Sequence, residues 1–458
     1  MPFTVLIIDQ GARGHVLSEA YERNKNVDKI VVAPGNDFIA FRRKKEIIVD
    51  KNCSLKNPCS LLELAKKYKP ELIDVAQDDA LANGIVDILQ KHGFTVFGPK
   101  KEAAKIEWDK AWARQFMALN SIPIPEYQIF CSEKSGINYL ERLYGLNPEN
   151  ALYIKASGLC MGKGAIKAIT LDEAIAAVKG MEHFGESGKT FLIERCIDGN
   201  EASIFAISDG KDYRIFRHAQ DYKKLLNNDE GPNTGGMGSV APSQAAKGLE
   251  KLIESEVIKQ ALNGLKAEKI DYMGILYAGL IVSNNKLSVL EYNARWGDPE
   301  IQVILPGIET DYLELVEACI TGRLNEIEIK EDNKSRVCIV GASNGYPQGY
   351  ETGKRITGLE SAMAMHNVSV YGAGISVTGN KLYSSGGRLF SIVAEGKDII
   401  EARNRALAAM TYINVGGSAP HYRTDIAEKE YNELSELRAK LPTAASCVAY
   451  RGLIKKAF

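Results

Sequence analysis

The first hundred residues alternate between short apolar runs and amphipathic stretches, and this alternation restricts the possible folds more than any other feature. The apolar runs are expected to form strands at residues 4–9, 29–34, 71–77 and 95–99. The stretches between them are expected to form helices at residues 16–24, 60–68 and 83–93. Buried parallel strands read as continuous apolar runs. The pattern therefore predicts an α/β fold with a doubly wound parallel sheet, whose binding site lies at the carboxyl ends of its strands.

The turn after the first strand is rich in glycine but is not a dinucleotide fingerprint. Residues 11–14 lack the G-x-G-x-x-G spacing, and no acidic residue ends the second strand, which argues against a nicotinamide cofactor. Arg13 and His15 stand at the head of the next helix, where free N–H groups and the helix dipole favour a phosphate. Polar residues at a surface turn are the alternative interpretation.

Length and charge narrow the classes of function. A chain of 458 residues has room for about three domains. Its formal net charge of −1 gives no overall field that would recruit nucleic acid or an anionic membrane. The chain opens directly on a strand with no leader pattern, and no apolar run approaches the roughly 18 residues of a membrane span. Its eight cysteines are scattered without a C-x-x-C pair, so we expect reduced thiols in a cytoplasmic protein.

Residues 100–120 are predicted to form one amphipathic helix. Its apolar face is expected to include Ala104, Trp108, Ala111, Trp112, Gln115, Phe116 and Leu119. Lys110 could reach from this helix towards a phosphate, or it could lie on a solvated face. The prolines at 123 and 125 end the helix and mark a boundary.

Residues 153–169 read as a strand, a glycine-rich hairpin and a second strand. Lys155 lies on the first strand and Lys163 in the hairpin. A Walker A loop needs G-x-x-x-x-G-K-[ST] before a helix, whereas here the glycine spacing is one residue short and Gly164 replaces the hydroxyl residue. The stretch therefore predicts a flap of backbone N–H groups and a lysine over phosphates, with a plain hairpin as the alternative.

Residues 219–242 form the most distinctive predicted loop. Two acids precede this loop: Glu194 ends an apolar strand, and Glu201 opens the next strand after a turn. The loop itself carries Asp221, Lys223, Asn233, Thr234 and Gly236, together with other polar residues. Long ordered loops in compact domains are usually functional, so we expect a binding role here.

Residues 287–302 carry the strongest predicted metal site. Strand alternation is expected to place Glu291 and Asn293 on the same side as Leu287 and Val289. A carboxylate and an amide suit Mg²⁺, which leaves its other positions to phosphates and waters. Arg295, Gly297 and Asp298 follow, so that the strand end could cradle a metal nucleotide and a developing anion. A polar strand end at the surface is the alternative.

The order of these motifs resembles the phosphoribosylamine–glycine ligases (glycinamide ribonucleotide synthetases), an ATP-grasp family of purine synthesis. The resemblance runs from residue 4 to about residue 427. It rests on the stretches VFGPKKEAAKIEWDKAWARQFM, KASGLCMGKGA, IERCIDGNEAS, AQDYKKLLNNDEGPNTGGMG, LEYNARWGDPEIQ, GYPQGY and SSGGRLFSIVA.

The resemblance implies three domains. Residues 1–100 would form the N-terminal domain, 101–325 an ATP-grasp module of two α+β lobes with its flap lobe at about 123–195, and 326–430 a small C-terminal α+β domain. Residues 431–458 would be a helix and tail to which we assign no role.

The resemblance also implies a reaction. Glycine would be ligated to 5-phosphoribosylamine through glycyl phosphate, giving glycinamide ribonucleotide, ADP and phosphate, with Mg²⁺ or Mn²⁺ as the metal. The partners would be these small molecules, with no nucleic acid or membrane, and the enzyme would be a monomer or a homodimer. A ligase for another small acid or amine, or an inactive nucleotide-binding homologue, are the alternatives.

The resemblance further implies residue roles. ATP would be bound by Lys110, Lys155, Lys163, Glu194, Ile197 and Glu201. The metal would be held by Glu291 and Asn293, and the catalytic groups would be Arg295, Asp221 and Lys223. The substrates would be bound by Arg13, His15, Asn36, Asp78, Asn233, Thr234, Gly236, Gly297 and Asp298.

Several positions depart from the family pattern. The family's first loop reads roughly GGREH, so that Gly14 here replaces an acid. The family's usual Gly-Pro-Glu is here residues 76–78, Ala-Gln-Asp, and a late Phe-His-Ala-Gly is here residues 371–374, Tyr-Gly-Ala-Gly. The usual Gly-Ser before the first ATP lysine is Trp-Asp, ending at Asp109, and the flap's Ala-Asp-Gly is Ala-Ser-Gly, centred on Ser157. The ATP apparatus is mostly retained, whereas the departures in the first and last domains bear on the identity of the amine.

Overall fold

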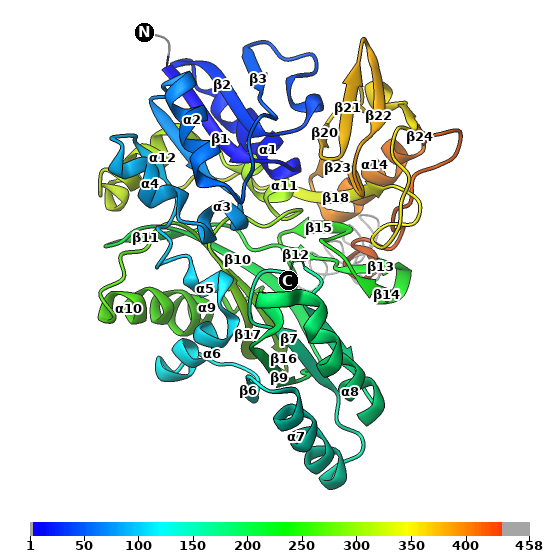
Figure 1. Ribbon diagram of the computed structural model, residues 1–458. Helices are drawn as coiled ribbons and strands as arrows, with labels where there is room; N and C mark the ends of the chain where they lie inside the picture. The colour runs from blue at the N-terminus through cyan, green and yellow to red at the C-terminus, as the bar shows by residue number, and fades with distance from the viewer. Residues whose placement is uncertain (1–2, 161, 433–458) are drawn as a thin grey trace, which may run out of the picture.

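The N-terminal domain is the predicted doubly wound sheet. The structure, a computed structural model, describes residues 3–160 and 162–432 (Figure 1). The strands of this domain are β1 (Phe3–Asp9), β2 (Val27–Pro34), β3 (Glu46–Val49), β4 (Leu72–Val75) and β5 (Val96–Phe97). They are all parallel, in the order β3-β2-β1-β4-β5, so the order reverses at β1. The short strand β3 was not predicted.

Helices cover both faces of this sheet because β1 alternates its contacts. Leu6 and Ile8 of β1 belong to the core that includes residues of α2 (Pro58–Tyr68) and α4 (Ile85–Lys91). Val5 and Ile7 belong to the core on the other face, with residues of α1 (Ala12–Arg23) and α12 (Tyr312–Ile320). The short helices α3 (Asp78–Ala82) and η1 (Asp37–Ala40) follow β4 and β2. Functional groups can therefore gather at the carboxyl edge of the sheet.

The single helix predicted over residues 100–120 is wrong. The structure has two helices, α5 (Lys105–Trp108) and α6 (Lys110–Leu119), and Asp109 between them is not helical (φ −126°, ψ 88°). The side chain of Asp109 accepts a hydrogen bond from Trp112 N (3.1 Å) and so caps α6. Leu119, expected on the apolar face, is 81% exposed.

Two antiparallel sheets form the middle and lower parts of Figure 1. The flap lobe contains β6 (Tyr127–Phe130), β7 (Leu152–Ala156), β8 (Ala165–Ala168) and β9 (Phe191–Arg195), with α7 (Glu133–Leu146), α8 (Leu171–Gly180) and η2 (Met181–Gly188). The strands β7 and β8 form the predicted hairpin. The second sheet contains β10 (Asn200–Asp209), β11 (Tyr213–Ile215), β16 (Met273–Ser283) and β17 (Lys286–Asn293). The helix that precedes β16 runs through α9 (Glu250–Ile253), η4 (Glu254–Ile258) and α10 (Lys259–Ala267).

The predicted alternation along β17 is also wrong, because the strand contains a β-bulge. Val289 pairs with Leu280 while Glu291 pairs with Gly279, so Leu290 is the extra residue. A bulge shifts the facing of every side chain beyond it. Tyr292 consequently joins Leu287 and Val289 in one core cluster, and Glu291 faces the opposite side of the sheet from them.

The predicted loop at residues 219–242 instead contains short strands that reach the C-terminal domain. Strands β12 (Gln220–Asp221) and β15 (Gly238–Ala241) join a five-stranded sheet with β18 (Ser335–Ala342), β23 (Arg388–Gly396) and β20 (Val368–Gly372). Between them lie the hairpin strands β13 (Lys224–Leu226) and β14 (Glu230–Asn233), joined by η3 (Asn227–Asp229). This pairing joins the segment rigidly to a sheet whose other strands come from residues beyond 334.

The remaining elements complete the C-terminal part and the connection to it. A four-stranded sheet is formed by β21 (Ile375–Thr378), β22 (Lys381–Ser384), β19 (Arg355–Thr357) and β24 (Asn414–Val415). The helices are α11 (Ile301–Ile304), η5 (Leu305–Gly307), η6 (Leu324–Glu326), α13 (Leu359–Met363) and α14 (Ile399–Met410). The predicted fold class is therefore confirmed, whereas the predicted domain limits stay a prediction. Among residues 3–160 and 162–432, no helix has the length and apolar character of a membrane span. Nearly all of the predicted tail lies outside the described residues.

Candidate active site

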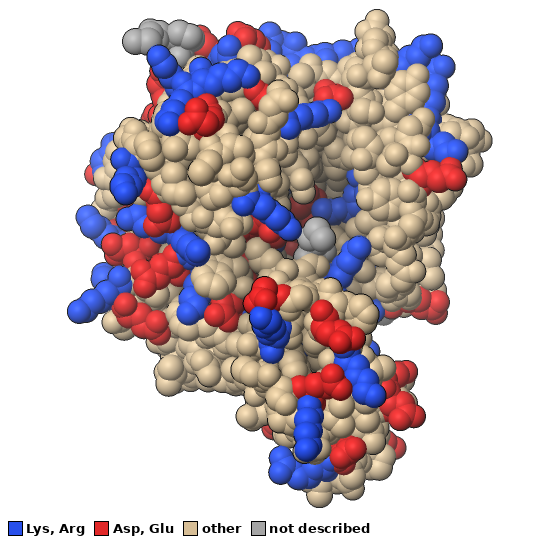
Figure 2. All heavy atoms as spheres, viewed as in Figure 1, with Lys and Arg blue, Asp and Glu red and all other residues tan. Residues whose placement is uncertain are grey.

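Charged side chains gather where the three parts of the molecule meet. Figure 2 shows a hollow in the middle of this face, with Lys, Arg, Asp and Glu side chains inside and around it. The end of β17, the start of α6, the flap and strand β12 all contribute charged groups to one electrostatic cluster. The site is therefore assembled from segments far apart in the sequence.

Glu291 lies among lysines from three different segments. Burial disfavours its charged form, but Lys223, Lys110 and Lys155 outweigh burial and lower the pKa of Glu291 below its ordinary value. Glu291 is therefore a carboxylate at neutral pH. The predicted meeting of the strand-end acid with the lysines is thus present in the structure.

Arg295 is held beside Glu291 by a network of oxygen atoms. Its Nη2 lies 2.7 Å from Glu107 Oε1, 3.9 Å from Asp78 Oδ2 and 3.3 Å from Asn293 Oδ1. Burial opposes its charge, but Glu107 and Asp78 raise the pKa of Arg295 further above its ordinary value. Its buried Nε has no partner within the described part of the chain. That donor is free for a ligand.

Glu194 is paired with two cations. Arg114 Nη2 lies 2.7 Å from Glu194 Oε1, and Lys155 Nζ lies 2.7 Å from Oε2. The role of Glu194 beside adenine stays a prediction. Arg114 was missed by the sequence analysis, although its position four residues after Lys110 places both on one face of α6.

Arg114 also explains the bulge in β17. Its Nη1 donates to Val289 O and its Nη2 to Leu290 O, both at 2.9 Å. A bulge leaves backbone groups without ladder partners, and Arg114 pairs with the carbonyls at this one. It therefore connects the facing of Glu291 to the position of Glu194.

Glu201, Lys223 and Asp221 form a second cluster. Lys223 Nζ lies 2.7 Å from Glu201 Oε2 and 3.7 Å from Asp221 Oδ2. Burial first, and then the charge of Glu300, raises the pKa of Asp221 well above its ordinary value. Asp221 Oδ1 is buried with no partner in the described residues. A polar ligand can satisfy this atom.

Thr234 and Gly236 fix the shape of the segment beside Asp221. Thr234 Oγ1 donates to Lys223 O (2.8 Å) and accepts from Gly236 N (3.0 Å). Gly236 has φ +108°, and a Cβ there would lie 2.8 Å from Asp221 Oδ1. Asn233 lies opposite Lys224 in the β13–β14 hairpin. The segment is thus organised around Asp221.

Lys110 on α6 and Lys163 in the flap differ in their surroundings. Lys110 Nζ donates to Gly158 O (3.4 Å), at the base of the flap. Lys163 is exposed, and its backbone N donates to Cys160 O (2.9 Å). A Cβ on Gly162 would lie 3.7 Å from Thr234 O, so the flap approaches the Thr234 segment. Ile197 is half-buried between β9 and β10.

Asp298 lies where β17 turns into α11. Arg388 Nη1 lies 3.4 Å from Asp298 Oδ1, and Gln302 Nε2 donates to the same atom (2.8 Å). Burial opposes the charge of Asp298, but Arg388 and then Arg13 lower its pKa. A Cβ on Gly297 would lie within 3 Å of the Glu300 carboxylate. Arg388, from β23, is a site residue that sequence reasoning missed within the quoted SSGGRLF stretch.

Arg13 is buried and engaged with the protein itself. Its guanidinium pairs with Asp9 and donates to Trp296 O (2.9 Å) and Gln77 Oε1 (3.0 Å). The carboxylate of Asp9 lies at the turn that carries Gly14. A Cβ on Gly14 would lie only 3.0 Å from Asp9 Oδ1. Phosphate binding by Arg13 stays a prediction. The contacts of its guanidinium connect helix α1 to the segment that follows β17.

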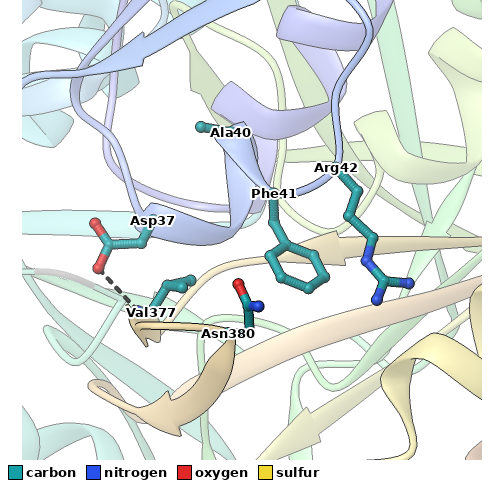
Figure 3. A pocket seen from close by; sticks show the side chains of 6 residues that line it. All are labelled: Asp37, Ala40, Phe41, Arg42, Val377 and Asn380. Carbon is teal, nitrogen blue, oxygen red and sulfur yellow. Dashed lines mark hydrogen bonds between the residues drawn. The ribbon is translucent and has the colours of Figure 1, made fainter.

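His15 and Asn36 join the N-terminal and C-terminal domains. The buried ring of His15 accepts from Gly372 N through Nδ1 (2.9 Å), and burial lowers its pKa. Asn36 Nδ2 donates to Gly372 O (2.9 Å), whereas its buried Oδ1 has no partner in the described chain. Figure 3 shows the nearby surface pocket at the same junction, where Val377 N donates to Asp37 Oδ2 (3.0 Å). The substrate roles of His15 and Asn36 stay predictions.

A metal would find two protein ligands here. Among the described residues, no cluster of three or more His, Cys, Asp or Glu side chains could hold an ion. Glu291 offers a carboxylate and Asn293 an amide oxygen, on a side of the sheet rich in cations. Such a set fits Mg²⁺ that takes its remaining ligands from a nucleotide and water, and it does not fit an ion held by protein alone.

Comparisons with known proteins agree with this geometry. Family models of phosphoribosylglycinamide synthetase match its N domain at residues 3–107, its ATP-grasp (A) domain at 108–301 and its C domain at 336–429. Phosphoribosylamine–glycine ligase of Caldanaerobacter subterraneus is 38% identical over 427 residues, covering 92% of this chain and 99% of that protein. The enzyme of the same name from Chlorobaculum tepidum is 38% identical over 431 residues, covering 93% and 99%.

A solved structure supports the same assignment. The crystal structure of phosphoribosylamine–glycine ligase from Thermotoga maritima superposes with a TM-score of 0.76 at 28% identity, covering 93% of this chain and all of that one. The chain therefore belongs to the phosphoribosylglycinamide synthetase family, the ATP-grasp phosphoribosylamine–glycine ligases.

Proposed function

We propose that this enzyme ligates glycine to 5-phosphoribosylamine with ATP, giving glycinamide ribonucleotide, ADP and phosphate in purine synthesis. The observation that carries the proposal is the ionised Glu291 surrounded by Lys223, Lys110 and Lys155, with Arg295 beside it. A site for a nucleoside triphosphate needs this combination, because the lysines neutralise the phosphates while the carboxylate binds the accompanying metal ion.

The cations would act on the phosphoryl group in transfer. The glycine carboxylate attacks the γ-phosphorus, the bond to the β,γ-bridging oxygen breaks, and ADP leaves. Lys110, Lys155 and Arg295 would balance the negative charge that spreads over the transferred oxygens. Each is held by the protein before substrate arrives, by Gly158 O, Glu194 and Glu107 respectively. Such preorganisation is the main source of catalysis in phosphoryl transfer.

Glu291 and Asn293 would hold the Mg²⁺ or Mn²⁺ ion that accompanies ATP. When bound, the ion supplies charge neutralisation and orientation of the phosphate chain. Arg295 Nη2 keeps Asn293 Oδ1 in place. Glu194, Ile197 and Glu201 would lie on the nucleoside side.

The substrate groups would lie on the other side of the phosphate. The amine of phosphoribosylamine attacks the carbonyl carbon of glycyl phosphate, phosphate leaves, and one amine proton must be accepted. Asp221, whose buried Oδ1 has no partner among the described residues, would bind the amine, and the departing phosphate would take the proton. Lys223 would bind an anionic substrate group or hold the carboxylates of Glu201 and Asp221 beside it, whereas the ionised Asp298 would bind a hydrogen-bond donor of the substrates. Glycyl phosphate hydrolyses when water reaches it. The flap bearing Lys163 would therefore cover it.

The remaining predicted substrate positions would frame this pocket. We propose this role for Arg13, His15, Asn36, Asp78, Asn233, Thr234, Gly236 and Gly297. Arg13 and His15 would act through their neighbours, because both are engaged within the protein. A cytoplasmic location and a monomeric or dimeric state stay predictions.

The direct test follows ADP release from enzyme, ATP and Mg²⁺ with glycine and freshly made phosphoribosylamine. We expect sustained release only with both substrates, and its loss in Glu291→Gln. Release that is no faster with the amine than without it would contradict the proposal.

A further inference from the structure

A side chain at the start of α6 contacts a side chain at the base of the flap. Asp109 directly precedes Lys110 and helix α6, and Ser157 directly follows strand β7, which carries Lys155. In the structure Ser157 Oγ donates to Asp109 Oδ1 at 2.9 Å, although 48 positions separate the two residues. The contact thus joins the acid that caps α6 to a hydroxyl of the flap lobe.

Asp109 and Ser157 accept hydrogen bonds from the free backbone N–H groups at the N-terminus of α6. The backbone N of Lys110 donates to Ser157 O, and the N of Ala111 donates to Ser157 Oγ, both at 2.9 Å. The third free N–H, that of Trp112, donates to Asp109 Oδ1 at 3.1 Å. These are three of the four N–H groups that a helix leaves unpaired at its start. Helix α6 is therefore capped jointly by its own aspartate and by a residue of the flap lobe.

Backbone hydrogen bonds to residues of the flap lobe also hold the flap base, Ser157 and Gly158. Ser157 N donates to Thr190 O (2.9 Å), and Gly158 N donates to Ser187 O (3.0 Å). Ser157 is 6% exposed, so its hydroxyl is a buried group that needs its partners. Lys110 directly follows Asp109, and its Nζ reaches Gly158 O. The contact thus couples the first ATP lysine to the first residues of the flap.

We propose that Asp109 and Ser157 are a positioning pair that fixes Lys110 and the flap base as one unit around the ATP phosphates. The inference rests on the proposed function. The pair works only when one member is an acid and the other a hydroxyl. Two carboxylates would repel at this distance, whereas two hydroxyls would lose a charge-assisted hydrogen bond. The exchange of the two residue types leaves the pair intact.

The test measures binding of MgAMP-PNP, a non-hydrolysable ATP analogue, to the full chain. Trp108 and Trp112 flank Asp109 and Lys110, so intrinsic fluorescence reports on this region. The variants are Ser157→Asp, Asp109→Ser and the double exchange Asp109→Ser/Ser157→Asp. Thr170→Ala is the matched control, because Thr170 caps α8 in the same lobe (Glu173 N to Oγ1, 3.2 Å). The KM for ATP and the thermal midpoint are measured in parallel.

We expect Ser157→Asp to weaken analogue binding about tenfold or more and to raise the KM for ATP, with a smaller loss in Asp109→Ser. The double exchange should return affinity to within about threefold of wild type, a coupling of ~1 kcal/mol or more. Thr170→Ala should lower the thermal midpoint and leave affinity unchanged.

Two results would overturn the pair: single variants that bind the analogue as well as wild type, or a double exchange no better than the weaker single variant. If Ser157→Asp does not fold, Ser157→Ala decides. A loss of about fivefold in affinity supports the pair, and an unchanged affinity refutes it. Wild-type enzyme that does not bind MgAMP-PNP would contradict the proposed function instead, so the two failures are distinguishable.

Discussion

Replacing Arg114 with methionine should destabilise the ATP-grasp domain far more than the loss of a surface charge would. The guanidinium is 3% exposed, pairs with Glu194 and donates to the carbonyls of Val289 and Leu290. Its removal leaves Lys155 as the remaining partner of Glu194 and unpairs two backbone carbonyls. Breaking a buried ion pair costs roughly 3–5 kcal/mol, and an unpaired carbonyl adds ~1 kcal/mol. Methionine regains part of this by packing, so we expect a loss of about 4 kcal/mol.

The assay is urea unfolding followed by fluorescence, since two of the three tryptophans, Trp108 at the end of α5 and Trp112 near the start of α6, lie close to Arg114 in the sequence. Arg195→Met is the matched control: its pair with Glu126 joins side chains that are 57% and 81% exposed, so we expect less than ~1 kcal/mol. The double variant Arg114→Met/Glu194→Gln should not recover this loss, because Lys155, 2.7 Å from Glu194, would then lose its partner as well. The reasoning is refuted if Arg114→Met costs no more than Arg195→Met.

Two further predictions concern the N-terminal domain and the substrate pocket. Burial raises the pKa of Asp74 from 3.8 to about 7 despite a hydrogen bond from Tyr21, so the folded state binds the extra proton between about pH 4 and pH 7. The free energy of unfolding should therefore fall by up to ~4 kcal/mol as pH rises through that window, and thermal midpoints should show a flatter profile in Asp74→Asn. Gly236→Ala should lower kcat/KM about tenfold or more, because its Cβ would meet Pro299 Cδ at 2.4 Å and Asp221 Oδ1 at 2.8 Å. Steady-state kinetics checks this. Gly349→Ala is the control, because its Cβ would meet nothing within 4 Å and kcat/KM should stay unchanged.

Local patterns were sufficient for much of the fold. The apolar runs before residue 100 predicted four of the five parallel strands, because a strand buried on both faces leaves a clear local signature. The hairpin carrying Lys155 and Lys163 was also predicted, since glycines mark its turn. The motifs then led to the family.

The errors arose where distant residues decide the local conformation. The helix break at Asp109 depends on Ser157, and the bulge at Leu290 on Arg114, so neither could be read from a short window. Strand β15 (Gly238–Ala241) pairs with residues 335–342, about a hundred positions further along the chain. The joining contacts of Arg13 likewise need Trp296 O, 283 positions away.

The account's central claim is that the bulged strand presents Glu291 and Asn293 to the flap lysines in order to hold a metal nucleotide. Electron paramagnetic resonance of Mn²⁺ in the presence of AMP-PNP measures this directly. We predict that Glu291→Gln weakens Mn²⁺ binding at least about tenfold (~1.4 kcal/mol), while Glu256→Gln, on an exposed helix surface, leaves it unchanged. Equal Mn²⁺ affinity in Glu291→Gln and wild type would contradict the claim.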